Sequence, residues 1–447
     1  MLHVRRMAHH SKDPHTLCTL LLALWFTRAG TVLAQTDTNI AAQLQALQQQ
    51  NEMLQKQLRN QQDVIDSLQH DVANIRQSNV QRDTSTSAEQ ADALENATAA
   101  SGSGVLNYGK VHISGEGGAG LFETGSEGFA PNAEFRLDEA RLFFDAQAWN
   151  NIYAYFELNL QTHEEANVFL GEAYVDAEDV SQLWGRPGQL NVRIGRMYIP
   201  FGEEYLYRHS IDNPLISHSL SDLWGYDEGV EVYGAAGKFG YVAAVQNGGE
   251  QPARDFTADK SLAGRLSYDP NQHLHFSLSG MRTGDLTAGG DRMSAIWFGS
   301  SFFFPLGSAT DFHANLAEAD IVWHLSRGYV RAFGGYVRYN DNLDNSRNIY
   351  YYTVEAVHDV TKKFYAAARF SQIIAPDGYT ILGNSNPAEY WPGPLTDRIW
   401  RLSLGVGYRW NHNFILKGEY SLERGKEVDG EDRNHEDLVA TEAVFAF

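Results

Sequence analysis

The charged side chains that could do chemistry in this sequence recur at every second position within apolar segments. The basic members of this polar set are Arg141, Arg193, Arg265, Arg369, Arg401, Arg409 and Lys417. The acidic members are Asp145, Glu157, Glu172, Asp176, Glu231, Glu355 and Glu419. If the segments enclose a water-filled pore, these charges act at low effective dielectric and select ions, with basic groups favouring anions. The alternative is that they pair across neighbouring strands and only stiffen the wall.

One stretch adds a backbone signal to these charges. Residues 191–199 predict a strand that runs into Pro200, Phe201, Gly202, Glu203 and Glu204. Pro200 removes a backbone donor and so ends the strand, and Gly202 permits a sharp turn. Arg196 is also a candidate for the pore lining. In a regular strand, however, its side chain would point away from the lumen, so it faces the pore only if a β-bulge precedes it.

The connection that follows, Phe201 to Asp227, is long and rich in apolar and aromatic side chains. A loop facing water would be more polar, so we expect this one to fold into the lumen and narrow it. Its only fixed positive charge is Arg208, because His209 and His218 are expected to be largely neutral at pH 7. We therefore expect Arg193 and Arg208 to set a weak anion preference, since only charges near the narrowest point escape screening.

Signals for catalysis, cofactors and metals are weak in this sequence. Gly115 to Gly120 fits a dinucleotide-binding glycine pattern, but no helical pattern follows it, and glycines in a strand near a loop explain it. The sequence has no Walker loop, no HExxH and no GxSxG, and the acidic stretch 429–437 lacks calcium-loop spacing. We predict no catalytic residue, no cofactor and no metal site.

Apolar and polar side chains alternate from Val105 to Phe447, which indicates β-strands. Within Asn151–Gln161, for example, Phe156 and Leu158 point one way while Glu157 and Asn159 point the other. The predicted strands are 105–120, 137–149, 151–161, 168–177, 190–199, 228–236, 239–247, 261–269, 272–283, 311–325, 328–340, 349–360, 362–373, 399–410, 412–423 and 435–447. The fold class we predict is all-β, a 16-stranded antiparallel transmembrane β-barrel preceded by an N-terminal α-helical coiled coil.

The connections between these strands support a membrane barrel. Minimal turns, such as 149–151 and 410–412, alternate with mostly longer connections, notably 201–227, 284–308 and 374–398. Membrane barrels have tight periplasmic turns and long external loops. Trp149, Tyr268 and Trp410 each stand beside a short turn, where an interfacial aromatic girdle belongs.

The first hundred residues predict three further segments. Residues 1–34 are typical of a cleaved signal peptide, with basic Arg5, Arg6 and Lys12 before an apolar stretch that contains the only cysteine, Cys18. Residues 38–80 carry an a/d heptad pattern, interrupted only by Asn51 and Gln61, and predict a coiled-coil oligomerisation segment. Residues 81–104 are typical of a flexible linker before the predicted barrel domain, 105–447.

Charge excludes one class of partner. The whole chain has a formal net charge of −21, and removal of residues 1–34 would leave −24. Such an acidic protein is a poor ligand for nucleic acid, so we expect none.

The stretch Ile194-Gly195 followed by Pro200-Phe201-Gly202-x-Glu204 resembles the strand motif of the phosphate-selective porin O/P family. The resemblance extends over the mature chain, including the leading coiled coil. It implies a trimer, a constriction made by the third external loop, and passage of small anions. This sequence departs from the family in one respect, because its predicted lining is mixed in sign rather than a dense ladder of basic residues.

The sequence therefore predicts an outer-membrane porin of a Gram-negative bacterium, with its coiled coil in the periplasm. It would give passive diffusion to small hydrophilic solutes, with a weak preference for anions such as phosphate. Its expected partners are a homotrimer, outer-membrane lipid and lipopolysaccharide. Two alternatives remain: an outer-membrane barrel hydrolase with a Ser–His site at the rim, and a structural tether between membrane and cell wall.

Overall fold

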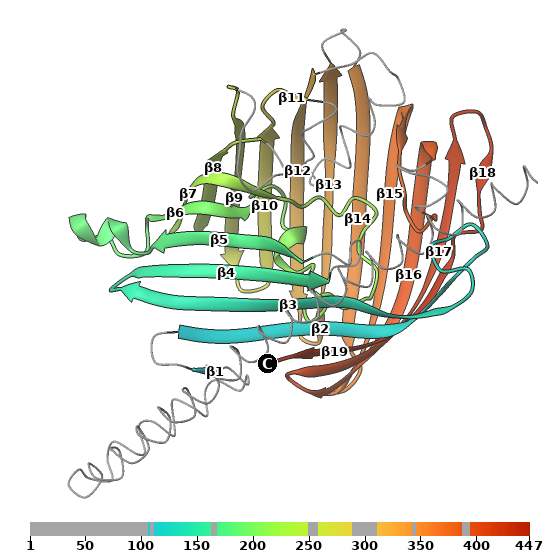
Figure 1. Ribbon diagram of the computed structural model, residues 1–447, viewed down its shortest axis with the longest axis horizontal. Coiled ribbons are helices and arrows are strands. Elements are labelled where there is room, and N and C mark those ends of the chain that lie inside the picture. Colours follow the sequence, from blue (N-terminus) through green and yellow to red (C-terminus); the bar gives the residue numbers. More distant parts are fainter. Residues whose placement is uncertain are drawn as a thin grey trace, which may run out of the picture. The chain divides into compact units, whose positions relative to one another are not determined.

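The structure is a computed structural model that describes residues 106–107, 111–161, 168–248, 258–287, 311–341, 346–386 and 394–447. These residues belong to one compact unit, Ser101–Phe447 (Figure 1). The predicted signal peptide, coiled coil 38–80 and linker 81–104 lie outside the described residues, so those three remain predictions.

The unit is built almost entirely from antiparallel strands, and sixteen of them are long. In chain order they are β2 (Val111–Thr124), β3 (Glu134–Trp149), β4 (Ile152–Gln161), β5 (Phe169–Ala177), β6 (Asn191–Tyr198), β7 (Tyr226–Ala236), β8 (Phe239–Gln246), β9 (Ser261–Asn271), β10 (Leu274–Arg282), β12 (Asp311–Leu325), β13 (Gly328–Asp341), β14 (Ser346–Asp359), β15 (Phe364–Thr380), β16 (Leu395–Asn411), β17 (Phe414–Glu427) and β19 (Leu438–Ala446). Minor elements are the two-residue strands β1 (Leu106–Asn107), β11 (Leu286–Thr287) and β18 (Asp432–Arg433), and the 3₁₀ turns η1 (Val180–Trp184) and η2 (Glu204–Leu206). No helix among the described residues is long and apolar enough to cross a membrane.

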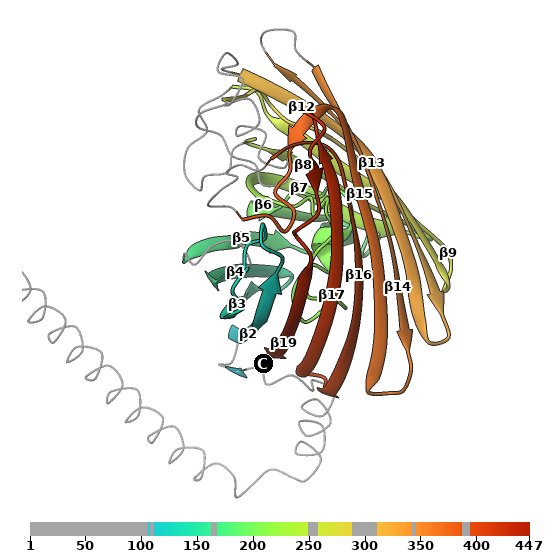
Figure 2. The same ribbon diagram turned by 90° about the vertical axis from the view of Figure 1, so that its right-hand side faces the viewer.

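The strands pair with their sequence neighbours around a closed ring. The last strand, β19, pairs with the first long strand, β2, from Leu438 opposite Thr124 to Ala446 opposite Glu116. Closure leaves no free sheet edge, so every strand finds backbone partners on both sides. Figures 1 and 2 show the strands β12 to β17 as the tallest part of the wall. The predicted sixteen-stranded antiparallel barrel is confirmed.

The glycine-rich stretch of β2 serves this closure. A side chain on Gly115 would place its Cβ 2.7 Å from the ring of Phe447, and one on Gly117 would lie 2.9 Å from the ring of Phe445. The backbones of Gly115 and Phe447 also exchange hydrogen bonds of 3.0 and 2.8 Å. The glycines are therefore explained by strand packing, and a nucleotide-binding loop is not needed.

The two faces of each strand differ as the alternation predicts. On β14, Tyr350, Tyr352 and Val354 are 41–48% exposed, whereas their neighbours Tyr351 and Glu355 are 1–3% exposed. An apolar, exposed outer face and a polar, buried inner face are the pattern of a barrel surrounded by lipid. Trp149 and Trp410, 72% and 62% exposed, lie at the ends of β3 and β16 next to short turns.

The observed strand bounds correct several predicted ones. β2 runs from Val111 to Thr124 rather than over 105–120, and β15 and β16 are each 17 residues long. The turn end of the barrel has one longer connection, residues 178–190, which contains η1. Its Asp179 accepts a hydrogen bond from the backbone N–H of Gly188, which has a φ of +73°.

Candidate functional site

The connection between β6 and β7, residues 199–225, folds inside the barrel and is called the internal loop from here on. Phe201, Leu220 and Leu223 of this loop are 3–8% exposed, a level typical of a protein core. Gly202 turns the chain with a φ of +65°, and a Cβ there would lie 2.3 Å from Oε1 of Glu318 on β12. Gly202 therefore combines the freedom of a positive φ with a close approach to the wall.

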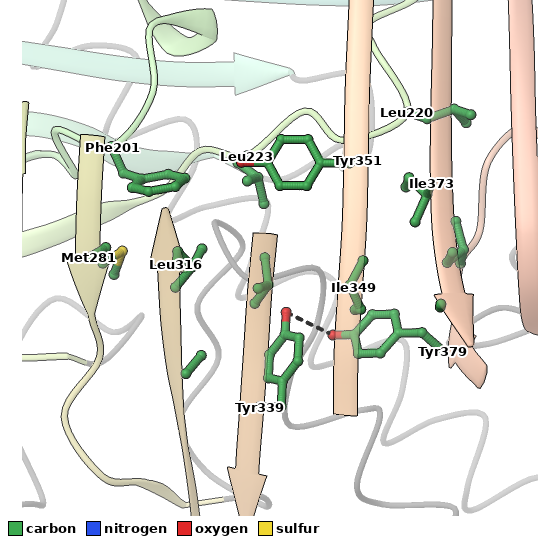
Figure 3. Packing of buried hydrophobic residues seen from close by; sticks show 14 of the residues in the cluster. Phe201, Leu220, Leu223, Met281, Leu316, Tyr339, Ile349, Tyr351, Ile373 and Tyr379 are labelled. Carbon is green, nitrogen blue, oxygen red and sulfur yellow. Dashed lines mark hydrogen bonds between the residues drawn. The ribbon is translucent and has the colours of Figure 1, made fainter. Parts of the chain in front are cut away.

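An apolar cluster fixes one part of the internal loop. Figure 3 shows Phe201 and Leu223 among inward side chains of successive strands, including Met281 of β10 and Leu316 of β12. Beyond them, the hydroxyl of Tyr379 donates to that of Tyr339 at 3.3 Å. Buried apolar contacts of this kind contribute about 1.5–3 kcal/mol for each large side chain, so the loop is held inside by packing.

Basic side chains of the wall fasten the backbone of the loop. Arg369 donates to the carbonyl of Ser217 and to Oδ1 of Asn213, each at 2.7 Å. Arg401 donates to the carbonyl of His218 at 3.2 Å. Lys417 donates to the carbonyls of Ser210 and Leu215, and Arg265 to the carbonyl of Gly202. Four of the predicted selectivity residues are therefore loop anchors.

Each of these four anchors also has a carboxylate partner. Arg369 donates to Glu355 at 2.7 Å, and Arg401 to Glu423 at 2.6 Å. Arg265 lies 3.5 Å from Glu203, and Lys417 lies 3.8 Å from Glu442. Such pairs neutralise the positive charges where they stand, which leaves little net positive potential for a passing ion.

Carboxylates of the wall also bind the backbone of the loop, through its N–H groups. Glu419 of β17 accepts from the backbone N–H groups of Ile216 and Ser217 at 2.6 and 2.8 Å. Glu139 of β3 accepts from the backbone N–H of Ser210 at 2.8 Å. Because charged acceptors make the stronger hydrogen bonds, these contacts hold the middle of the loop to the part of the wall between β17 and β3.

Arg141 is the centre of a further contact between wall and loop. Its guanidinium lies 2.6 Å from Glu139 and 3.2 Å from Glu157, and 2.8 Å from Nε2 of His209. The other ring nitrogen of His209 lies 2.9 Å from Glu116. Burial and the charge of Arg141 lower the pKa of His209, but the hydrogen bond and charges of the nearby glutamates outweigh them, so its pKa is raised above the ordinary value.

Arg193 and Arg208, the two residues expected to act together, are each paired separately. Arg193 lies 3.0 Å from Asp176 and 3.1 Å from Glu231 on the adjacent strands. Arg208, only 2% exposed, pairs with Asp222 of the same loop at 2.7 Å. Burial raises the pKa of Asp222, but the charges of Arg208 and His218 dominate and hold it well below its usual range.

Arg196 and Arg409 lie apart from the internal loop's anchors. Arg196, 6% exposed, donates to the carbonyls of Leu170 and Gly171 at 3.3 and 3.0 Å and pairs with Glu228 at 2.9 Å. Arg409 pairs with Asp359 at 2.7 Å near the short-turn end. Neither residue contributes an uncompensated charge.

The motif glutamates take different roles. Glu203 lies 2.8 Å from Nε2 of His275 on β10. Glu204 stays within the loop and accepts from the hydroxyl of Ser219 at 2.6 Å and from its backbone N–H at 3.2 Å. Burial, reinforced by the charge of Asp222, raises the pKa of Glu204 to about 7.

Sequence reasoning missed one basic residue of the inner wall. Arg331 of β13 pairs with Glu355 at 2.7 Å and stacks 3.5 Å from the ring centroid of Tyr207 in the internal loop. Gly334 and Gly335 interrupt the alternation of apolar and polar side chains in β13. The sequence therefore did not show that Arg331 points inward.

Several inward carboxylates were also missed. They are Glu116, Glu139, Glu318, Asp320, Glu423 and Glu442, all at most 7% exposed. The sequence does indicate the direction of two of them. Glu139 is two residues from Arg141 and Glu423 is four residues from Glu419, so each points to the same face of its strand as a residue already predicted to point inward. Among the described inward side chains, acidic groups therefore exceed basic ones. No group of three or more His, Cys, Asp or Glu within the described part of the chain is placed to hold a metal ion.

The sequence matches no family model, and no relative was found among curated proteins. Solved structures with a similar fold are outer-membrane proteins. OmpT, an outer membrane protein of Vibrio cholerae, is 11% identical over 77% of this chain and 100% of its own, with a TM-score of 0.52. An anion-selective porin from Comamonas acidovorans is 11% identical over 75% of this chain and 99% of its own, with a TM-score of 0.51. OprB of Pseudomonas putida is 9% identical over 76% of this chain and 94% of its own, with a TM-score of 0.50.

At these identities the similarity shows the fold alone. The fold is that of the β-barrels of Gram-negative outer-membrane proteins, porins among them. Membership of the phosphate-selective porin O/P family is not shown and remains a prediction.

Proposed function

We propose that this chain is an outer-membrane porin through which small hydrophilic solutes diffuse passively. The observation that carries the proposal is a closed barrel with an apolar outer face, a charged inner face and a loop anchored inside it. An anchor or tether needs neither a wide barrel nor an internal loop, whereas a selective pore uses both.

The test is electrical. Purified protein added to a planar lipid bilayer in potassium chloride should produce stepwise current increases of uniform size. A hydrolase or a tether gives no such steps, so the two alternatives from the sequence separate from the channel in one experiment.

A second question is whether the channel prefers anions or cations. The weak preference for anions such as phosphate depends on Arg193 and Arg208, and both are paired with carboxylates at 2.7–3.1 Å. The inward acidic groups exceed the basic ones among the described residues, so the fixed charges support a weak cation preference better. The anion preference stays a prediction, and the reversal potential in a salt gradient decides between the two.

The assembly we propose is a homotrimer in contact with outer-membrane lipid and lipopolysaccharide, with residues 38–80 as a periplasmic coiled coil. Support comes from the heptad pattern and from the resemblance to the porin O/P family. Native mass measurement of the detergent-solubilised protein tests it, and a monomer at all concentrations would contradict it. A trimer that persists after deletion of 38–80 would assign assembly to the barrels.

A further inference from the structure

The internal loop covers the inner wall unevenly. On β13 to β16 the central inward side chains, such as Phe333, Thr353, Ser371 and Ser403, are buried. On the opposite side, some inward side chains of β3 to β7, such as Tyr155, Tyr174 and Arg193, keep partial exposure, although others on the same strands, such as Arg141 and Glu157, are buried. This second side therefore offers a passing solute partly exposed inward side chains that the first side lacks.

The exposed side is lined by aromatic rings, and we call it the aromatic wall: Phe143, Tyr155, Tyr174 and Tyr233. The rings of Tyr155 and Tyr174 stack with centroids 5.1 Å apart, and those of Phe143 and Tyr155 with centroids 6.4 Å apart. Each ring comes from a different strand, so the row runs around the lumen rather than along one strand.

The contacts of Arg193 show which kind of chemical group binds to this wall. Its guanidinium carbon lies 4.3 Å from the ring centroid of Tyr174 and 4.9 Å from that of Tyr233. Asp176 and Glu231 bind its nitrogens at 3.0 and 3.1 Å. A cation between aromatic rings and carboxylates gains from both, because the ring faces and the carboxylates are negative.

The same combination recurs elsewhere inside the barrel. Arg208 lies 4.1 Å from the ring centroid of Trp224 and pairs with Asp222. Arg331 lies 3.5 Å from Tyr207 and pairs with Glu355. The interior is thus repeatedly built to hold guanidinium groups by a ring and an acid.

One ring-and-acid pair on the aromatic wall forms no ion pair with a basic side chain of the described residues, although His112 of β2 stands opposite its carboxylate residue, Asp145, in the strand pairing. Asp145 stands directly opposite Tyr155 in the pairing of β3 with β4, two residues beyond Phe143. Asp145 is exposed, and its carboxylate makes no ion pair or hydrogen bond within the described residues. Nearby, Oδ1 of Asp176 is buried without a hydrogen-bond partner in the described chain.

We propose that the aromatic wall, with Asp145 opposite Tyr155, favours the passage of small organic cations that carry a guanidinium or ammonium group. This inference rests on the proposed channel function and names its solute class. A cationic solute at this wall meets the ring and carboxylate combination that holds Arg193, whereas an anionic solute meets the carboxylate of Asp145, which no ion pair compensates.

The test compares three solutes of similar size and different charge. Uptake of labelled L-arginine, L-glutamine and L-glutamate is measured in liposomes containing the full protein, beside its conductance in potassium chloride. Arginine should enter fastest and glutamate slowest. Glutamate uptake equal to or faster than arginine uptake, with normal conductance, overturns the inference and leaves the channel standing. Absence of all conductance overturns the channel and the inference with it.

Two variants locate the effect. Tyr155→Leu and Asp145→Asn should each lower the ratio of arginine to glutamine uptake by about two- to fivefold, the range expected for a partly exposed cation–ring contact. Tyr352→Leu is the matched control, because Tyr352 is 41% exposed on the outer face of β14. An unchanged ratio in both variants, with the control and conductance normal, would also overturn the inference.

Discussion

The guanidinium of Arg369 on β15 donates to Oδ1 of Asn213 in the internal loop at 2.7 Å, a contact between residues 156 positions apart. The same guanidinium reaches Glu355 on β14 and the carbonyl of Ser217. One wall residue thus joins two strands and two points of the loop, which makes it an anchor rather than a free charge in the pore.

We predict that Arg369→Ala loosens the internal loop. Charged hydrogen bonds of this kind are worth about 1.5–3 kcal/mol each, so the thermal midpoint should fall and the open-channel current should become noisier. Arg398→Ala is the control, because Arg398 is largely exposed and its closest carboxylate, Asp397, is 4.0 Å away. Equal current noise in the two variants would contradict the anchoring role.

Shortening the internal loop should raise the single-channel conductance. Removal of residues 206–223 takes away Leu220 and Leu223 from the apolar cluster and the hydrogen bonds that Ile216 and Ser217 donate to Glu419. The remaining barrel keeps every strand pairing, because β6 and β7 pair directly from Tyr198 opposite Tyr226. Unchanged conductance in a folded variant would place the constriction elsewhere.

The loop should be held less firmly as pH rises from about 4.5 to 7. The pKa of Glu204 is raised from 4.5 to about 7 in the folded protein, so folding binds a proton in this window and stability falls as the pH increases through it. The pKa of His209 is raised above its ordinary value of 6.5, so its contribution to stability also falls with rising pH, but only above about pH 6.5. Glu204→Gln should flatten the pH dependence of the thermal midpoint, whereas Glu178→Gln, in an exposed turn, should leave it unchanged.

Barrel closure should depend on Gly117. Its substitution by Val places side-chain atoms against the ring of Phe445 and the backbone of Glu139, where a Cβ alone would come within 2.9 and 3.1 Å. Overpacking of this kind typically costs 1–3 kcal/mol, so the fraction of protein that migrates as a folded barrel in unheated electrophoresis samples should fall. Gly280→Ala, which meets no atom within 4 Å, should fold normally.

The sequence predicts the strands well because the alternation of apolar and polar side chains is a local signal. Neighbouring residues such as Phe156 and Glu157 already distinguish the outer face of the barrel from the inner face. Ion-pair partners are different, because they depend on the register between strands. Irregularities between Gly118 and Ala119, and between Phe156 and Leu158, shift that register without a mark in the sequence. The role of Arg369 is hidden for a further reason, since its loop partner becomes a neighbour only when the whole barrel has closed.

The sign of selectivity tests the charge pairing. With Arg193 and Arg208 neutralised by carboxylates, the reversal potential in a potassium chloride gradient should show a weak cation preference. Replacing both arginines by Ala frees Asp176, Glu231 and Asp222 and should strengthen that preference. An anion-selective wild type would instead support the expectation drawn from the porin O/P resemblance.

The central claim, a channel with an internal loop, is tested most directly by single-channel recording of the purified full-length protein in a planar bilayer. The account predicts discrete, uniform conductance steps whose size increases when residues 206–223 are removed. A correctly folded barrel, judged by its β-rich circular dichroism, that gives no steps either with or without those residues would contradict it.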